Sequence, residues 1–142
     1  MRARPLGPSE QAIVTAALPP QLRRLFYRQP RGDQRHALNV YLRLDDPTPI
    51  EAQAALLHDV GKHDVGLGAV GRSLATVWSW TGLPIWGNWR TYIEHGPRGA
   101  EMLEAASADP FVVVFTRRHP GPAPDGFDSE AWARLAAADH DG

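Results

Sequence analysis

Prolines and helix-capping residues recur at short intervals along this chain and divide it into segments the length of short helices. Thr48 can cap a helix that begins at Pro49, with Glu51 completing a capping box. That helix is predicted to continue through AQAALLHDV and to end at Gly61. Asp109 and Asp128 carry similar start signals, so we predict helices over 111–118 and 129–139.

The remaining segments divide in the same way. Ser9 is predicted to cap a helix to Leu18, Pro20 opens a helix over 21–28, and Asp33 caps a third helix. The predicted apolar face of the third consists of Ala37, Leu38, Tyr41, Leu42 and Leu44. Further helices are predicted over 73–80, 89–94 and 97–106, and residues 119–127 are read as a loop.

The run Val112-Val113-Val114 favours a strand by propensity, but the Asp109-Pro110 start signal favours a helix there. The chain has no strong pattern of alternating apolar and polar residues and no second composition regime. We therefore predict an all-α fold, a single-domain helical bundle over residues 1–142.

Composition limits the chemistry available to this bundle. The sequence has no cysteine, which excludes disulfides and thiolate metal sites, so any metal must be held by His, Asp or Glu. A net charge of −1 gives no electrostatic footprint for duplex nucleic acid or an anionic membrane surface. The beginning of the chain lacks an apolar leader, and no apolar stretch approaches the roughly 18 residues of a membrane span. The expected location is the cytoplasm.

The dipeptide His-Asp occurs twice in the segment HDVGKHDVG, as His58-Asp59 and as His63-Asp64. The first copy ends an amphipathic helix and is the better pair of metal ligands. The second follows Gly61 and is interpreted as surface or outer residues without a direct metal role. Helical bundles build metal sites from side chains on facing helices. The candidates here, spread over different predicted helices or their boundaries, are His36, His58, Asp59, His95, His119 and Asp139.

The order His36, His58-Asp59, Asp139 resembles the H…HD…D ligand pattern of the HD superfamily of metal-dependent phosphohydrolases. The local sequence ALLHDVGK is typical of that family. The segments HGPRGAEML, RRH and LAAADHDG resemble its later motifs. The resemblance covers residues 33–141, with 1–32 forming N-terminal helices.

The resemblance implies a metal centre. His36, His58, Asp59 and Asp139 would hold one divalent ion, and Asp59 would bridge to a second ion completed by His95 and His119. The implied cofactor is one or two ions of Mn, Fe, Ni, Co, Zn or Mg. Asp139 lies near the end of the sequence, where fraying is expected, which leaves Asp141 as an alternative ligand. The cyclic-dinucleotide phosphodiesterase branch of the family carries a paired histidine and a GYP signature, and this sequence resembles those two features only weakly.

The resemblance also implies an enzyme that cleaves a phosphoester of a nucleotide or similar small molecule through a metal-activated water. Asp59 and Lys62, the single lysine of the chain, would be catalytic. Candidate phosphate-binding residues are Arg98, Arg117 and Arg118. The alternatives are a di-iron oxygenase of HD-domain type and a non-catalytic, metal-containing nucleotide-binding module.

Four tryptophans gather in one stretch of the sequence, around Gly82 and Pro84: Trp78, Trp80, Trp86 and Trp89. They could wall a base-binding pocket, but a packed core or a homodimer contact is the favoured interpretation.

Overall fold

The computed structural model describes residues 2–62 and 98–140, and all regular secondary structure in these ranges is helical. The helices are α1 (Pro8–Ala17), α2 (Pro20–Arg28), α3 (Arg31–Arg43), α4 (Pro49–Leu57), α7 (Pro110–Arg118) and α8 (Ser129–His140). Residues 98–105 are also helical. The predicted all-α fold is confirmed.

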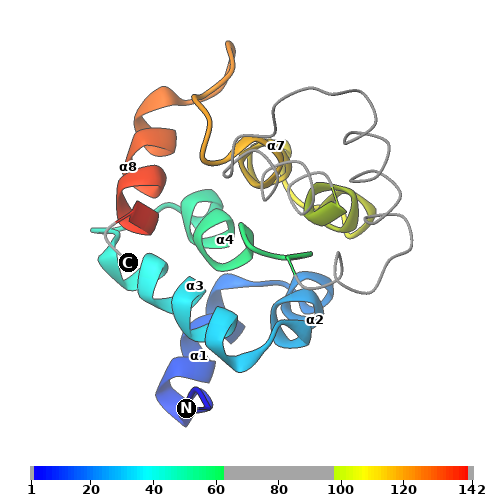
Figure 1. The fold of residues 1–142 in the computed structure, drawn as a ribbon, viewed down its shortest axis with the longest axis vertical. Coiled ribbons are helices and arrows are strands. Elements are labelled where there is room, and N and C mark those ends of the chain that lie inside the picture. Colours follow the sequence, from blue (N-terminus) through cyan, green and yellow to red (C-terminus); the bar gives the residue numbers. More distant parts are fainter. Residues whose placement is uncertain (1, 63–97, 141–142) are drawn as a thin grey trace, which may run out of the picture.

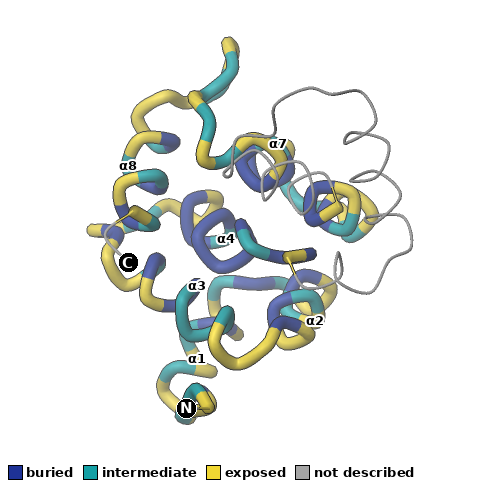
Figure 2. The backbone as a smooth tube through the Cα atoms, in the orientation of Figure 1, coloured by how far each residue is buried: buried dark blue, intermediate teal, exposed yellow. Residues whose placement is uncertain are grey.

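Helix α4 is the centre of the fold, and it contacts α1, α2, α3, α7 and α8 (Figure 1). Its sequence PIEAQAALL offers small and aliphatic side chains on almost every side, so neighbouring helices can approach it from several directions. Ala54, Ala55, Leu56 and Leu57 are fully buried, and the α4 tube is almost entirely dark blue in Figure 2. Whatever follows Leu57 is therefore placed in the middle of the molecule.

The predicted starts of four helices are confirmed. Helix α2 begins at Pro20. At α4, Thr48 Oγ1 accepts a hydrogen bond from Glu51 N, and Glu51 Oε2 accepts one from Thr48 N. The side chains of Asp109 and Asp128 accept backbone hydrogen bonds at the starts of α7 and α8. The valine run is helical, because this cap and the burial of the α7 face outweigh β propensity.

Two predicted caps are wrong. Helix α1 begins at Pro8, before Ser9, and Gly7 N donates to Glu10 Oε2. Helix α3 begins at Arg31, so Asp33 lies inside its first turn rather than at its cap. In both cases a proline marks the boundary better than the polar side chain that follows it. Its fixed φ and missing N–H suit the edge of a helix.

The predicted inner face of α3 is wrong at Leu42, which is 57% exposed. The residues that α3 buries against the core are Ala37, Leu38 and Val40, followed by Leu44 at its C-cap. At about 100° per residue, Leu42 lies about 140° from Ala37, past the edge of this buried stripe.

Helix α4 ends at Leu57, earlier than the predicted end at Gly61. Residues 58–62 form a turn in which Val60 N donates to Leu57 O and Lys62 N donates to Asp59 O. Gly61 has φ of 91°, a conformation that suits glycine. The His-Asp pair therefore stands at the junction of helix and turn, where its side chains leave the helix axis.

The turn after α4 passes very close to the helical segment 98–105. A Cβ added at Gly61 would lie 2.7 Å from Gly99 N. A Cβ added at Gly99 would overlap the carbonyl oxygen of Val60 and lie 3.1 Å from Thr116 Cγ2. The two glycines allow two backbones to meet where larger residues would hold them apart.

Several sequence predictions fall outside the described residues. These are the helices over 73–80 and 89–94, the start of the helix over 97–106, and the tryptophan-rich segment. Within the described ranges, no helix has the length and apolar character needed to cross a membrane.

Candidate metal centre

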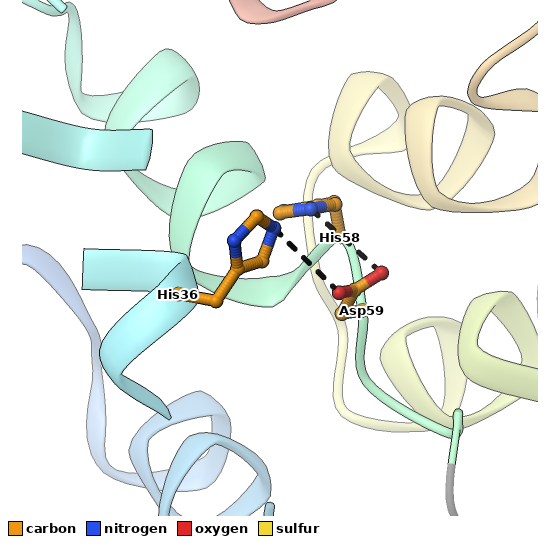
Figure 3. Close-up of side chains that lie close together, drawn as sticks. All are labelled: His36, His58 and Asp59. Carbon is orange, nitrogen blue, oxygen red and sulfur yellow. Dashed lines mark ion pairs between the residues drawn. The ribbon is translucent and has the colours of Figure 1, made fainter. Parts of the chain in front are cut away.

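Four helices bring five predicted ligand residues to one place. His36 comes from the middle of α3, and His58 and Asp59 come from the end of α4 (Figure 3). His119 is the C-cap of α7, and Asp139 lies in the last turn of α8. Helices α3, α7 and α8 surround α4, so their ligands meet where α4 ends (Figure 1).

Asp139 lies between three imidazoles. Its Oδ1 is 2.9 Å from His36 Nε2 and 3.3 Å from His58 Nε2. Its Oδ2 is 2.7 Å from His119 Nε2. The sequence resemblance assigned His119 to a second ion with Asp59, whereas the fold places His119 beside Asp139.

Asp59 completes the cluster on another side. Its Oδ1 is 3.7 Å from His58 Nε2, and its Oδ2 is 3.9 Å from His36 Nε2. His36, His58 and Asp59 each offer one potential ligand atom, and these three atoms all lie within 4.8 Å of one another. The same is true of His58, His119 and Asp139. His58 belongs to both groups and is the centre of the arrangement.

The tautomer of His58 follows from its surroundings. Its side chain is 1% exposed, and Nδ1 lies 2.9 Å from the carbonyl oxygen of Ala55, which can only accept a hydrogen bond. Nδ1 therefore carries a proton. The buried Nε2 atom has no aligned hydrogen-bond partner among the described residues. A backbone carbonyl that orients one imidazole nitrogen while the other faces carboxylates is typical of metal-binding histidines.

The spacing of the donor atoms also fits a cation. With metal–ligand distances of about 2.1 Å, neighbouring ligand atoms lie about 3.0 Å apart in an octahedral site and about 3.4 Å apart in a tetrahedral one. The distances around His58 Nε2, 3.3 Å to Asp139 and 3.7 Å to Asp59, are close to this range. Imidazole and carboxylate together suit several divalent transition metals.

The electrostatics of the cluster show strong coupling between imidazoles and carboxylates. Burial alone would lower the pKa of His58, but the carboxylates of Asp139 and Asp59 outweigh it and raise that pKa. Burial alone would raise the pKa values of Asp59 and Asp139, but neighbouring groups outweigh it in both cases. His58 and Lys62 lower the pKa of Asp59, and His119 and His58 lower the pKa of Asp139. The two carboxylates are therefore held ionised, which is the form that binds a cation.

Among the basic residues that the sequence analysis proposed for the site, Lys62 lies closest to this cluster. Its Nζ lies 3.5 Å from Asp59 Oδ2, and its side chain is 42% exposed. The ammonium group thus lies at the rim, between the partly buried carboxylate of Asp59 and solvent.

The three predicted arginines lie on the surface. Arg98 is exposed at the start of the described part of the 98–105 segment, and Arg118 is exposed at the end of α7. Arg117 lies 3.8 Å from Glu104, and both side chains are largely exposed. Within the described residues, no side-chain hydrogen bond or ion pair joins these three arginines to the metal-ligand cluster. His95, His63, Asp64 and Asp141 lie outside the residues that the structure describes.

Sequence reasoning missed the residues that hold α8, and with it Asp139, in place. Arg134 Nη1 lies 3.0 Å from Oε1 of the buried Glu51 at the start of α4, and Arg134 Nη2 donates to Asp45 O. Arg43 Nη1 donates to the carbonyl oxygen of Ala138, next to Asp139. Glu51 was recognised as a capping residue, but no sequence signal marked Arg134 as its partner.

Comparison with protein-family models, with curated proteins and with solved structures finds no match to this chain. The geometry of the cluster is therefore the observation from which the chemistry of this chain is inferred.

Proposed function

We propose that this protein is a metal-dependent phosphohydrolase of the HD superfamily that cleaves a phosphoester of a nucleotide or similar small molecule. One observation carries the proposal. Residues that follow the order H…HD…D meet around the buried Nε2 of His58, whose proton is fixed on the opposite nitrogen by Ala55 O.

The proposed ligands of the first divalent ion are His36, His58, Asp59 and Asp139. An ion bound there would activate a water molecule and polarise a phosphoryl oxygen near neutral pH. A second ion would use His119 and His95, and it belongs to the proposal rather than to the described geometry. The native metal is one of Mn, Fe, Ni, Co, Zn or Mg.

The side chains of the polypeptide have separate roles. Asp59 supplies a carboxylate that is ionised and oriented, and its contact with Lys62 keeps the ammonium beside the cluster. Lys62 reaches toward solvent, from which a phosphorylated substrate would arrive. A fixed positive charge at that position stabilises the negative charge that develops on a phosphoryl group during attack.

The experiment combines metal analysis with an activity screen of the full chain. The wild-type protein is loaded in turn with each candidate metal and assayed on nucleoside 5′-monophosphates, para-nitrophenyl phosphate and bis(para-nitrophenyl) phosphate. Substitution H58Q should remove both bound metal and activity. Substitution H140Q changes an exposed histidine on the same helix as Asp139 and should retain both.

Lys62 is tested separately, because it should act on charge rather than on metal binding. Substitution K62M should lower kcat by about 100-fold with metal content unchanged, and K62R should restore part of the loss. Equal kcat in K62M and wild type would remove Lys62 from the mechanism.

The same screen distinguishes the alternatives. Metal-loaded protein without hydrolysis of any phosphoester would contradict the proposal. Oxygen consumption by an iron-loaded sample would then indicate an oxygenase, and tight nucleotide binding without turnover would indicate a binding module.

A further inference from the structure

The basic residues of this chain are concentrated in its first helices. Residues 1–44 contain eight arginines and two acidic residues, whereas the remaining sequence contains seven basic and fourteen acidic residues. The net charge of −1 therefore conceals two regions of opposite charge. Because an anionic partner responds to the local charge of a surface, the first helices can attract one although the whole chain is nearly neutral.

Part of this charge lies on the outer side of α2. Arg24, Tyr27 and Arg28 are exposed there, and they face away from the buried Leu22 and Phe26. This side of the helix borders an open depression of about 560 Å³, a volume in the range of ligand-binding clefts. The described residues that line it are Pro20, Arg23, Arg24, Tyr27 and Arg28.

Two of the three arginines of α2 have no partner within residues 2–62 and 98–140. The guanidinium of Arg23 donates to the carbonyl oxygens of Thr15 and Leu18, but no side-chain hydrogen bond or ion pair engages Arg24 or Arg28 in these ranges. Arg24 and Arg28 lie about 6 Å apart along the helix axis. This separation is wider than the phosphate spacing within a nucleoside triphosphate and is close to that of successive phosphates in an extended nucleic acid strand.

Tyr27 places an aromatic ring beside these arginines. Its side chain is 40% exposed, and its ring centroid lies 5.2 Å from that of the buried Phe26, with an angle of 86° between the ring planes. The core residue therefore supports a ring that is accessible to a ligand. Cationic side chains interleaved with an exposed aromatic ring are the combination that binds single-stranded nucleic acids, in which unpaired bases can stack.

Arg28 connects this side of α2 to the candidate metal centre. It also lines the small pocket that is lined by Asp59, a member of the metal-ligand cluster, and by Lys62. Helix α2 contacts α4, and the turn that follows α4 runs beside α2 in Figure 1. A ligand with one phosphate at the metal centre can therefore continue past Lys62 and Arg28 onto the outer side of α2.

We propose that the outer side of α2 binds a short single-stranded oligonucleotide whose scissile phosphoester lies at the metal centre. Arg28 and Arg24 bind successive phosphates of the strand, and Tyr27 stacks against one of its bases. This inference rests on the proposed function and names its substrate class.

Binding is tested in the presence of chelator by fluorescence anisotropy of a short, labelled oligothymidylate. The double substitution R24Q/R28Q should weaken binding by at least about tenfold near about 0.1 M salt. Each phosphate that a protein neutralises on a single strand contributes about −0.7 to the slope of log affinity against log salt, so this slope should become shallower by about 1.4. The control R2Q/R4Q makes the same charge change at exposed positions near the N-terminus and should leave affinity and slope close to wild type.

Tyr27 is tested by a different property of the same binding curve. Substitution Y27L removes the ring and should weaken binding by at least about fivefold, with the salt slope unchanged, because stacking does not depend on the release of counterions. Y27F keeps the ring and should retain the affinity. Equal affinities of Y27L and wild type would overturn the stacking and, with it, the assignment to a single strand.

Activity measurements separate this inference from the proposed function. R24Q/R28Q should lower kcat/KM on the oligothymidylate but not on bis(para-nitrophenyl) phosphate, which is too short to reach α2. Binding that R24Q/R28Q removes, without hydrolysis by the metal-loaded wild type, would support the surface and contradict the phosphohydrolase. Hydrolysis of bis(para-nitrophenyl) phosphate without oligothymidylate binding would overturn the surface and leave the phosphohydrolase standing. Binding only to vesicles of phosphatidylserine and phosphatidylcholine would assign α2 to a membrane and would also overturn the proposal.

Discussion

The close approach of the two backbones at Gly61 and Gly99 makes a sharp prediction about stability. Substitution G99A adds one methyl group that would overlap the carbonyl oxygen of Val60 and press on Thr116. Neither neighbour yields easily, because one is backbone in a tight turn and the other is a buried, β-branched residue of α7.

The size of the effect follows from two opposing contributions. Overpacking against atoms that cannot move costs up to about 3 kcal/mol, and the better helix propensity of alanine returns up to about 1 kcal/mol. The net loss is about 2 kcal/mol. For a chain of 142 residues the entropy of unfolding is about 300 cal/mol/K, so the midpoint of thermal unfolding should fall by roughly 7 °C.

The matched control is G32A, at a helical glycine where an added Cβ has nothing within 4 Å. This change should leave stability unchanged or raise it by roughly 0.5 kcal/mol. Urea denaturation of the two variants and wild type measures the difference. G99A should also bind metal more weakly, because Val60 adjoins Asp59. A G99A variant as stable as G32A would refute the close approach of the two backbones.

The other predictions concern the proposed metal ligands, two buried polar groups and one surface carboxylate. Substitutions H58A and D59A should each abolish bound metal, whereas H63A and D64A should retain it; metal content measured by mass spectrometry decides this, and loss only in the second pair would reverse the assignment. Substitution R134M leaves the buried Glu51 carboxylate without its partner and should cost about 1–3 kcal/mol in urea denaturation, less if E51Q is present as well; an additive double mutant would show that the two do not interact. T116V removes a buried hydroxyl with no partner among the described residues and should raise the free energy of unfolding by about 1 kcal/mol, so a loss of similar size would point to an unseen polar partner. The hydrogen bonds from Arg35 and Gly7 lower the pKa of Glu10 from 4.5 to about 2, so its contribution is present above pH 4.5 and is lost as pH falls toward 2; E10Q should flatten the pH dependence of stability across that window, and an unchanged profile would contradict the pairing.

Local signals explain which parts of the fold the sequence predicted. The caps at Thr48, Asp109 and Asp128 each depend on residues within a few positions, so they are readable from the sequence and are found as expected. The caps at Ser9 and Asp33 failed because a proline just before each already fixed the boundary. The exposure of Leu42 depends on which side of α3 faces α4, and that is a tertiary property.

The candidate site also contains residues that the sequence indicated and residues that it did not. The order of His36, His58, Asp59 and Asp139 suggested a shared centre through the family resemblance, and these residues do lie together. The Glu51–Arg134 pair and the contact at Gly99 had no sequence signal. Each arises from segments that meet only in three dimensions, where spacing along the chain carries no information.

The contact between His36 and Asp139 spans 103 residues, so this ligand pair closes a loop that encloses most of the polypeptide. A metal ion bound by both His36 and Asp139 would cross-link the two ends of that loop. The loop could then gain conformational entropy by unfolding only after the coordination had been broken. Metal binding and global unfolding would then be a single cooperative event. A chelator would consequently remove the proposed activity and, at the same time, the restraint that holds α3 and α8 together on one core.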